Sequence, residues 1–179
     1  MSDICILGID PGSSGAIALY WPSAPHMIIA EDVPTVDGTI DPAALARRLE
    51  EARPAVAMVE LVGAMPKQGV SSTFKFGMAY GLVRGVIGAS YIPMHLVTPG
   101  KWKKHFRLSS DKEEARALAT RLWPSATCFA RKKDHGRAEA ALIARYAAET
   151  MFNDVRPVDE WGTLGDAAMA VVQNLGKRI

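Results

Sequence analysis

Three short apolar runs near the start of the chain predict a β-meander. Residues 4–10, 15–20 and 27–31 are rich in Ile, Leu and Ala. Each is bounded by Pro, Gly or Ser, the residues that reverse a chain within a few positions. We therefore expect three consecutive strands joined by tight turns.

Helix patterns alternate with apolar runs in the rest of the chain. Asp41 and Pro42 have the residue types of an N-cap and a first helical position. Further helices are expected to begin at Ser71 or Ser72 and at Ser109 or Ser110. The predicted strands are residues 55–60 and 91–97, and the predicted helices are 41–52, 71–88, 109–123, 137–150 and 162–175.

This order of elements predicts one α/β domain over residues 1–179, with a mixed five-stranded sheet flanked by helices. The 179 residues are 49% hydrophobic and 22% charged, as in an ordinary globular protein. No apolar run approaches the roughly 20 residues that a membrane helix needs. The N-terminal residues include the acidic Asp3 rather than the basic residues that begin a secretory signal, so no such signal is expected. With only two cysteines, Cys5 and Cys128, we expect a reducing, cytoplasmic location and no membrane partner.

Charge is divided unevenly along the chain. Residues 1–66 contain 3 Lys or Arg and 9 Asp or Glu, whereas the remainder contains 18 basic and 10 acidic residues. Such a division indicates an acidic site in one part and a surface that faces a polyanion in another, although a mixed surface can scatter its charges by chance.

Two of the predicted strands end in a carboxylate. Asp10 follows the apolar run that begins at Ile4, and Glu60 ends the run 55–60. A carboxylate at the end of a buried strand is costly unless positive charge meets it. Asp10 also fits a plain Asp-Pro-Gly turn, so its interpretation depends on whether other carboxylates meet it.

A third carboxylate lies within an apolar, Ala-rich helix. Glu139 is surrounded in sequence by Ala, Leu and Ile, so it needs a partner when buried. His135, four residues earlier, lies about 40° away around a helix and shares its face. Asp134 lies about 140° away and reaches Glu139 only if it precedes the helix and turns inward.

Converging carboxylates repel one another unless cations are present. Hard oxygen ligands favour Mg²⁺, with Mn²⁺ able to substitute. Two such ions about 3.5–4 Å apart are a standard arrangement for in-line displacement at phosphorus. The pattern therefore predicts two Mg²⁺ ions per site.

In these motifs the sequence resembles the RuvC family of Holliday junction resolvases, especially its phage-type members, within the ribonuclease H-like superfamily. The similarity covers roughly residues 4–150, and each motif is weak by itself. The motifs that carry it, in order, are Gly8-Ile-Asp-Pro-Gly-Ser-Ser-Gly15, Val59-Glu60, Gln68-Gly69 with Phe76-Gly77, Trp102-Lys103, Asp111-Lys112-Glu113 and Asp134-His-Gly-Arg-Ala-Glu139.

The resemblance implies a ribonuclease H-like fold and a homodimeric endonuclease that cuts four-way DNA junctions with magnesium by symmetric paired nicks. Asp10, Glu60 and Glu139 match three of the family's four acidic ligands. The fourth position departs from the pattern, because the family has an acid or histidine where this chain has Gly136. Asp134 is favoured as the replacement ligand, with His135 close to the site, although either residue also fits an ordinary helix cap.

DNA-facing residues are expected in three basic segments. Lys112 matches a functional lysine of the family and is a candidate for contact with the scissile phosphate, although it also fits an ordinary surface lysine. Trp102 is expected either to stack on DNA or to anchor its loop in the core. The remaining candidates are Lys67, Gln68, Lys101, Lys103, Lys104, Arg107, Arg131, Lys132 and Lys133.

The helix 71–88 is a candidate dimer interface. Its residues Phe74, Met78, Leu82 and Val86 form a stripe at spacing four, which by itself is typical of a core-facing helix. The resemblance implies an interface on this element. Two other functions stay open: another ribonuclease H-like nuclease that cuts RNA–DNA hybrids or flaps, and a catalytically impaired junction-binding protein. The resemblance also implies a bacterial or phage-infected cell as the setting.

Overall fold

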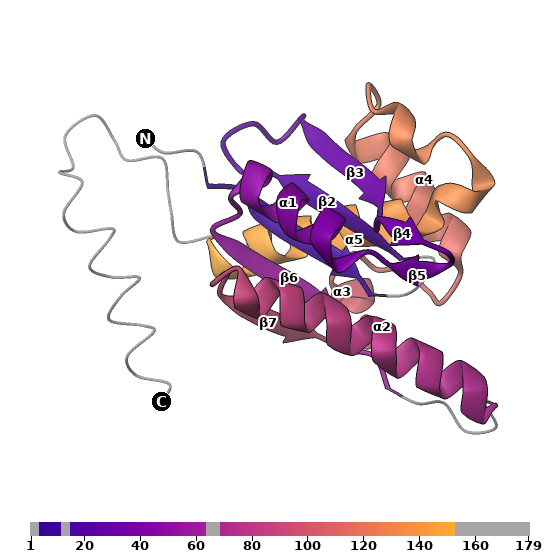
Figure 1. The fold of residues 1–179 in the computed structure, drawn as a ribbon. Coiled ribbons are helices and arrows are strands. Elements are labelled where there is room, and N and C mark those ends of the chain that lie inside the picture. Colours follow the sequence, from indigo (N-terminus) through magenta and orange to yellow (C-terminus); the bar gives the residue numbers. More distant parts are fainter. Residues whose placement is uncertain (1–3, 12–14, 64–68, 153–179) are drawn as a thin grey trace, which may run out of the picture.

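The protein forms a five-stranded mixed sheet with helices on both faces (Figure 1). The computed structural model describes residues 4–11, 15–63 and 69–152. The sheet strands are β1 (Ile6–Asp10), β2 (Ala16–Tyr20), β3 (Ile28–Asp32), β6 (Val56–Glu60) and β7 (Met94–Val97). The helices are α1 (Pro42–Ala52), α2 (Val70–Ala89), α3 (Pro99–His105), α4 (Lys112–Leu122) and α5 (His135–Met151).

The strands lie in the order β3-β2-β1-β6-β7. β2 pairs antiparallel with both β1 and β3, whereas β6 pairs parallel with both β1 and β7. This confirms the predicted mixed five-stranded sheet. Because β1 and β6 are parallel and central, their carboxyl ends lie at the same edge of the sheet.

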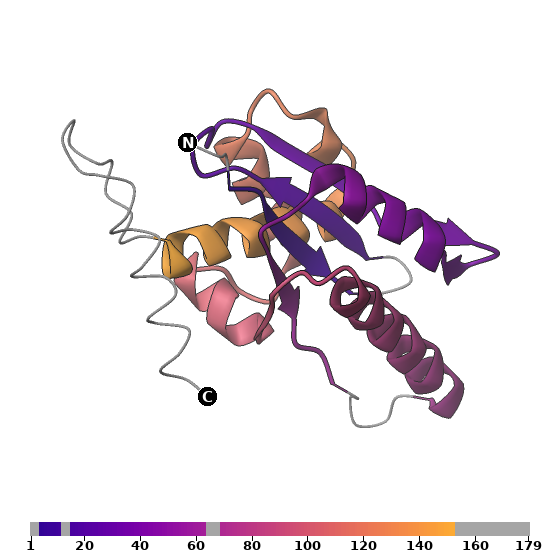
Figure 2. The same ribbon diagram turned by 60° about the vertical axis from the view of Figure 1, so that its left-hand side comes forward.

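Alternating side chains divide the core into two layers. Leu7 and Ile9 face the layer beneath α1 and α2, while Ile6 faces the layer beneath α5. Figures 1 and 2 show α1 and α2 on one face and α5 on the other, with α3 and α4 beside α5. The period of two therefore assigns every second residue of β1 to the α5 side.

Gly8 allows α5 to lie directly on β1. A Cβ at this position would come within 2.2 Å of the Ala140 carbonyl oxygen and 2.4 Å of the Ala144 amide nitrogen. Both are backbone atoms, which cannot rotate away as the end of a side chain can. A residue without a side chain is therefore required where β1 crosses α5.

The predicted element order is confirmed, and two predicted caps are wrong. Asp41 caps α1 as expected, accepting hydrogen bonds from two backbone amides. α2 begins at Val70 after Gly69, without a side-chain cap, and Asp111 rather than a serine caps α4. The predicted helix 162–175 lies outside the described residues.

A two-stranded hairpin and a short helix were not predicted. Strands β4 (Thr35–Val36) and β5 (Thr39–Ile40) form a hairpin whose Asp37-Gly38 turn has positive φ at both residues, and an Asp-Gly pair is a known signal for such a turn. Helix α3 begins at Thr98-Pro99, a cap followed by proline at the first position. Among the described residues, no helix is long and apolar enough to cross a membrane.

Replacement of Gly8 by alanine tests the contact between α5 and β1. We expect Gly8→Ala to lower the free energy of unfolding by about 2–4 kcal/mol, because the new methyl group meets rigid backbone. Urea denaturation followed by circular dichroism measures this. The control is Gly88→Ala in α2, where a Cβ meets nothing within 4 Å. That variant should be stabilised by up to about 1 kcal/mol, and equal effects at both positions would contradict the argument.

Candidate active site

Asp10 and Glu60 lie side by side at the carboxyl ends of adjacent parallel strands. The register pairs Ile9 of β1 with Val59 of β6, and the two acids follow directly. Side chains alternate between the two faces of a strand, so Asp10 faces α5 as Ile6 does. Glu60 faces the same side as Val56 and Met58 of β6. Glu60 is 9% exposed.

Glu139 reaches the same place from α5. It lies in the first half of the helix, next to Ala140, whose backbone contacts β1 at Gly8. Glu139 is 7% exposed, and its charge raises the pKa of both Asp10 and Glu60. The structure therefore brings together the three carboxylates expected from the sequence.

Helix α3 supplies hydrogen bonds to two of these carboxylates. Trp102 is fully buried, and its Nε1–H donates to Glu60 Oε1 at 2.7 Å. Lys103 Nζ donates to Glu139 Oε1 at 2.9 Å, and the same ammonium lies 5.1 Å from the Trp102 ring centroid. The orientation of both glutamates thus depends on two consecutive residues of α3.

The electrostatic balance of the site favours additional positive charge. Burial, together with the charges of Glu139 and Glu60, raises the pKa of Asp10 to about 7. Burial also raises the pKa of Glu60, while the hydrogen bond from Trp102 lowers it. Lys103 and Lys112 oppose these shifts, so both lysines lie within electrostatic reach of Asp10. Two lysines do not neutralise three carboxylates.

The chemistry of these donors fits a hard divalent cation. All three are carboxylate oxygens, the ligands that Mg²⁺ and Mn²⁺ prefer. In the part of the chain that the structure describes, no three His, Cys, Asp or Glu side chains stand close enough to hold a metal ion as they are. The hydrogen bonds from Trp102 and Lys103 engage one oxygen each of Glu60 and Glu139. Each of these hydrogen bonds therefore leaves the second oxygen of its glutamate for a further ligand.

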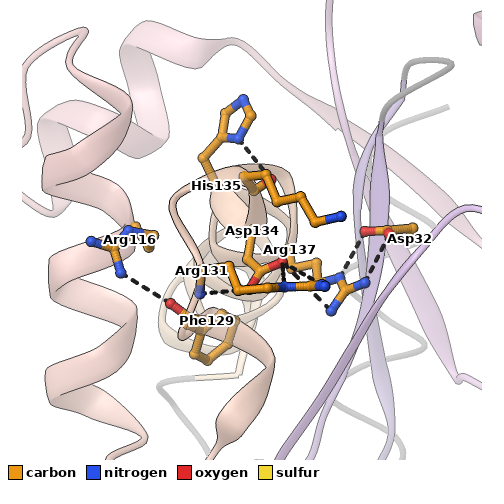
Figure 3. A network of polar contacts seen from close by, with 8 residues as sticks. Asp32, Arg116, Phe129, Arg131, Asp134, His135 and Arg137 are labelled. Atoms are coloured by element: carbon orange, nitrogen blue, oxygen red, sulfur yellow. Dashed lines mark hydrogen bonds and ion pairs between the residues drawn. The ribbon is translucent and has the colours of Figure 1, made fainter.

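Asp134 does not join the three carboxylates, contrary to the sequence-based expectation. Its side chain is 3% exposed and faces Arg131, whose backbone amide and guanidinium both donate to it. Figure 3 shows Asp134 turned toward Arg131 and Arg137, with Asp32 beyond Arg137. The hydrogen bonds from Arg131 hold the pKa of Asp134 below its ordinary value. The physical reason is the short 3₁₀ turn (Lys132–Asp134) before α5, which directs Asp134 back toward residue 131.

His135 is the first residue of α5, one turn before Glu139. Its Nδ1 lies 3.0 Å from the Lys133 carbonyl oxygen, and Figure 3 shows its ring turned away from Asp134. Spacing four places His135 on the helix face of Glu139. Of the two residues expected to complete the site, His135 is the one that the Arg131 network does not engage.

Trp102 is not available to stack on DNA, because its side chain is fully buried. The expected alternative, anchorage in the core, is correct. Its hydrogen bond to Glu60 was not predicted from the sequence, since residues 101–107 were read as a loop rather than as part of a helix. The Thr98-Pro99 helix start is the signal that could have identified α3 and hence which side of it faces inward.

The other basic residues of this region line an open cleft beside the site. The cleft has a volume of about 720 Å³, and Lys103, Lys104 and Arg107 contribute to its walls. Lys101 on α3 is exposed, as are Arg131, Lys132 and Lys133 before α5. The predicted contacts Lys67 and Gln68 lie outside the described residues.

The chain matches no protein-family model and no curated protein. Among solved structures, Thermus thermophilus RuvC bound to a Holliday junction substrate has a TM-score of 0.59 at 19% identity, covering 82% of this chain and 95% of RuvC. A second Thermus thermophilus RuvC structure has a TM-score of 0.52 at 16% identity, covering 82% of this chain and 96% of RuvC. The yeast mitochondrial Holliday junction resolvase Ydc2 has a TM-score of 0.46 at 17% identity, covering 79% of this chain and 78% of Ydc2. The two RuvC structures show that this chain has the RuvC-like, ribonuclease H-like fold predicted from the sequence.

The raised pKa of Asp10 predicts how stability depends on pH without metal. Between its unfolded value of about 3.8 and its folded value of about 7, the folded state binds more protons, so stability falls as pH rises. Asp10→Asn removes this cost. We expect it to raise the free energy of unfolding at pH 8 by about 1–3 kcal/mol in EDTA, and the two proteins to converge near pH 4. Urea denaturation over this pH range measures both.

Asp32, which ends β3, is a matched control for this prediction. Its pKa is lowered by hydrogen bonds from Arg137, so Asp32→Asn should reduce stability at pH 8 rather than raise it. Mg²⁺ should stabilise the wild-type protein at pH 8 and have little effect on Asp10→Asn. Identical pH profiles for wild type and Asp10→Asn would contradict the electrostatic picture.

Proposed function

We propose that this protein is a structure-selective endonuclease that resolves four-way DNA junctions by metal-dependent hydrolysis and symmetric paired nicks. The observation that carries the proposal is the convergence of Asp10, Glu60 and Glu139 beneath α5 on a RuvC-like fold. One structure with this fold is a RuvC bound to a Holliday junction substrate, which supports the choice of DNA. We further propose that the chain is a single nuclease domain acting in the cytoplasm of a bacterial or phage-infected cell.

The three carboxylates would hold two Mg²⁺ ions, for which Mn²⁺ can substitute. When bound, such ions lower the pKa of a water nucleophile and neutralise charge on the leaving 3′ oxygen. The carboxylates supply the negative charge that retains the cations. His135, four residues before Glu139, is the proposed fourth group at the edge of the site.

The neighbouring side chains orient and balance this site. Trp102 fixes one oxygen of Glu60, which leaves the other free for a ligand. Lys103 and Lys112 bring positive charge to the carboxylates from two helices. A scissile phosphate approaching the site would meet both ammonium groups, and Lys112 is the proposed direct contact.

The DNA backbone would follow the positive surface on the α3 and α5 side of the sheet. The cleft lined by Lys103, Lys104 and Arg107 opens beside the carboxylates. Arg107 has the left-handed backbone conformation (φ 56°) that commonly ends a helix, and its amide donates to the Lys104 carbonyl at the end of α3. The proposed phosphate contacts are Lys101, Lys103, Lys104, Arg107, Arg131, Lys132 and Lys133, with Lys67 and Gln68 near the junction centre.

Helix α2 is the proposed homodimer interface. Its core-facing residues are Ala79, Val83 and Ile87, while Phe74 and Met78 are 67% and 51% exposed. The sequence stripe is therefore only partly core-facing. Next to the exposed apolar residues, Gly77, Gly81 and Gly85 form a stripe with open space above each Cα. Two copies of α2 could approach closely along this stripe and bury Phe74 and Met78.

A catalytically impaired junction-binding protein is the second candidate, and one observation favours it. Asp134 pairs with Arg131 rather than with the three carboxylates, so the site has one acidic ligand fewer than expected. Binding of a junction without cutting would support this candidate. Cutting of RNA–DNA hybrids would instead indicate another ribonuclease H-like nuclease.

The test is a cleavage assay with three labelled substrates: a four-way junction, a linear duplex and an RNA–DNA hybrid, each with Mg²⁺ or EDTA. We expect paired, symmetric nicks in the junction only, and only with Mg²⁺. Absence of cutting in every substrate, with intact junction binding, would rule out the nuclease.

Asp10→Asn should abolish junction cleavage and leave junction binding largely intact, because it removes a metal ligand rather than a DNA contact. We expect the single-turnover rate to fall by at least about 10²-fold. Gel-shift titration in Ca²⁺ measures affinity separately. Asp37→Asn, in the exposed turn between β4 and β5, is the control with the same charge change, and it should retain cleavage. A wild-type rate for Asp10→Asn would show that the site is assigned wrongly.

A charged or bulky residue on the exposed face of α2 should weaken the proposed dimer. Phe74→Glu and Gly81→Leu are expected to weaken dimerisation by at least about tenfold, through a buried charge and through steric separation of the helices. Sedimentation equilibrium measures the dissociation constant. Val70→Glu, at the exposed start of the same helix, is the control for surface charge. A monomeric wild-type protein at micromolar concentration would exclude the proposed interface.

A further inference from the structure

A buried carboxylate organises the basic turn that precedes α5. Asp134 accepts a 2.8 Å hydrogen bond from the Arg131 backbone amide and bonds of 2.9 and 3.1 Å from its guanidinium. Asp134 is 3% exposed, whereas the Arg131 side chain is 55% exposed. The carboxylate therefore holds both the backbone and the side chain of a surface arginine.

Arg137 ties this turn to the sheet. Its guanidinium donates two 2.7 Å hydrogen bonds to the carboxylate of Asp32, the last residue of β3. It also lies 3.8 Å from Asp134 Oδ1. Figure 3 shows the four side chains as one network, with Arg137 between the two acids. Arg137 of α5 thus links Asp134 in the turn to the end of β3.

The result is a basic surface with a fixed shape. Arg131, Lys132 and Lys133 are exposed, and two of their neighbours are also basic: Arg137, and Arg116 of α4, which donates to the Phe129 carbonyl. A 3₁₀ turn over Lys132–Asp134 sets the direction in which these side chains leave the backbone. Flexible lysines lose conformational freedom when they bind phosphate, and a preformed turn reduces the backbone part of that cost.

We propose that Asp134 is a positioning residue which, through Arg131 and Arg137, holds residues 131–133 as a preformed binding surface for DNA phosphates, and that it binds no metal. This rests on the proposed function, since it assumes that the polyanion is the DNA substrate. The bidentate geometry matters, because a guanidinium can engage a carboxylate with one side and still present N–H groups to a phosphate.

Asp134→Asn distinguishes positioning from simple charge. By charge alone, loss of an acid from a basic surface should strengthen DNA binding. Loss of positioning should weaken it. We expect the dissociation constant of a labelled four-way junction in Ca²⁺ to rise by about 3- to 10-fold and the salt slope of binding to fall by about 1. Cleavage at saturating junction should keep its wild-type rate.

Binding of Mn²⁺ without DNA, measured by calorimetry, tests the second half of the proposal. Asp134→Asn should bind Mn²⁺ as the wild-type protein does, whereas Asp10→Asn should lose Mn²⁺ binding. The matched control is Glu31→Gln, which removes an acid of β3 that accepts a hydrogen bond from Arg48 of α1. That variant should bind the junction as tightly as wild type or slightly more tightly.

Arg131→Lys is the second variant, and it keeps the positive charge of residue 131. It replaces Asp134→Asn if that protein proves too unstable to study. Lysine cannot make the bidentate contact, so junction affinity should again fall by about 3- to 10-fold. Unchanged or tighter binding by either variant, or loss of Mn²⁺ binding in Asp134→Asn, would overturn the proposal. A wild-type protein that binds no junction would instead overturn the proposed function from which it starts.

Discussion

The contact between the backbone of α5 and β1 at Gly8 is the constraint on which the rest of the candidate site depends. With the helix directly on the strand, Glu139 reaches the carboxyl edge of the sheet where Asp10 and Glu60 end. A side chain at residue 8 would lift the helix and with it one of the three carboxylates. The close packing that makes the domain compact and the geometry of the acidic site are therefore the same feature.

This geometry leaves the site electrostatically unbalanced. Burial and mutual repulsion raise the pKa of Asp10 to about 7, and the two nearby lysines only partly offset the three acids. A folded protein keeps such a site at a cost in stability, which is the usual sign of a functional cluster rather than a structural one.

Much of this arrangement could be predicted from the sequence, because apolar runs bounded by turn residues, and acids set among apolar residues, are local signals. They identified the sheet, Asp10, Glu60 and the buried Glu139. Asp134 could not be placed in the same way. It precedes α5 in a short turn, so helical spacing does not set its direction, and a partner three residues earlier decides it. Trp102 was missed as a partner of Glu60 because the short α3 went unrecognised despite its Thr98-Pro99 start.

The seven-residue helix α3 contributes to both the carboxylate site and the basic cleft. Trp102 and Lys103 hold the glutamates from one side, while Lys103 and Lys104 line the basic cleft on the other. Under the proposed function, a substitution at Lys103 would change a DNA contact and the orientation of Glu139 together. Evolutionary change in substrate preference is therefore expected to accumulate elsewhere on the basic surface, where substitutions leave the carboxylates unchanged.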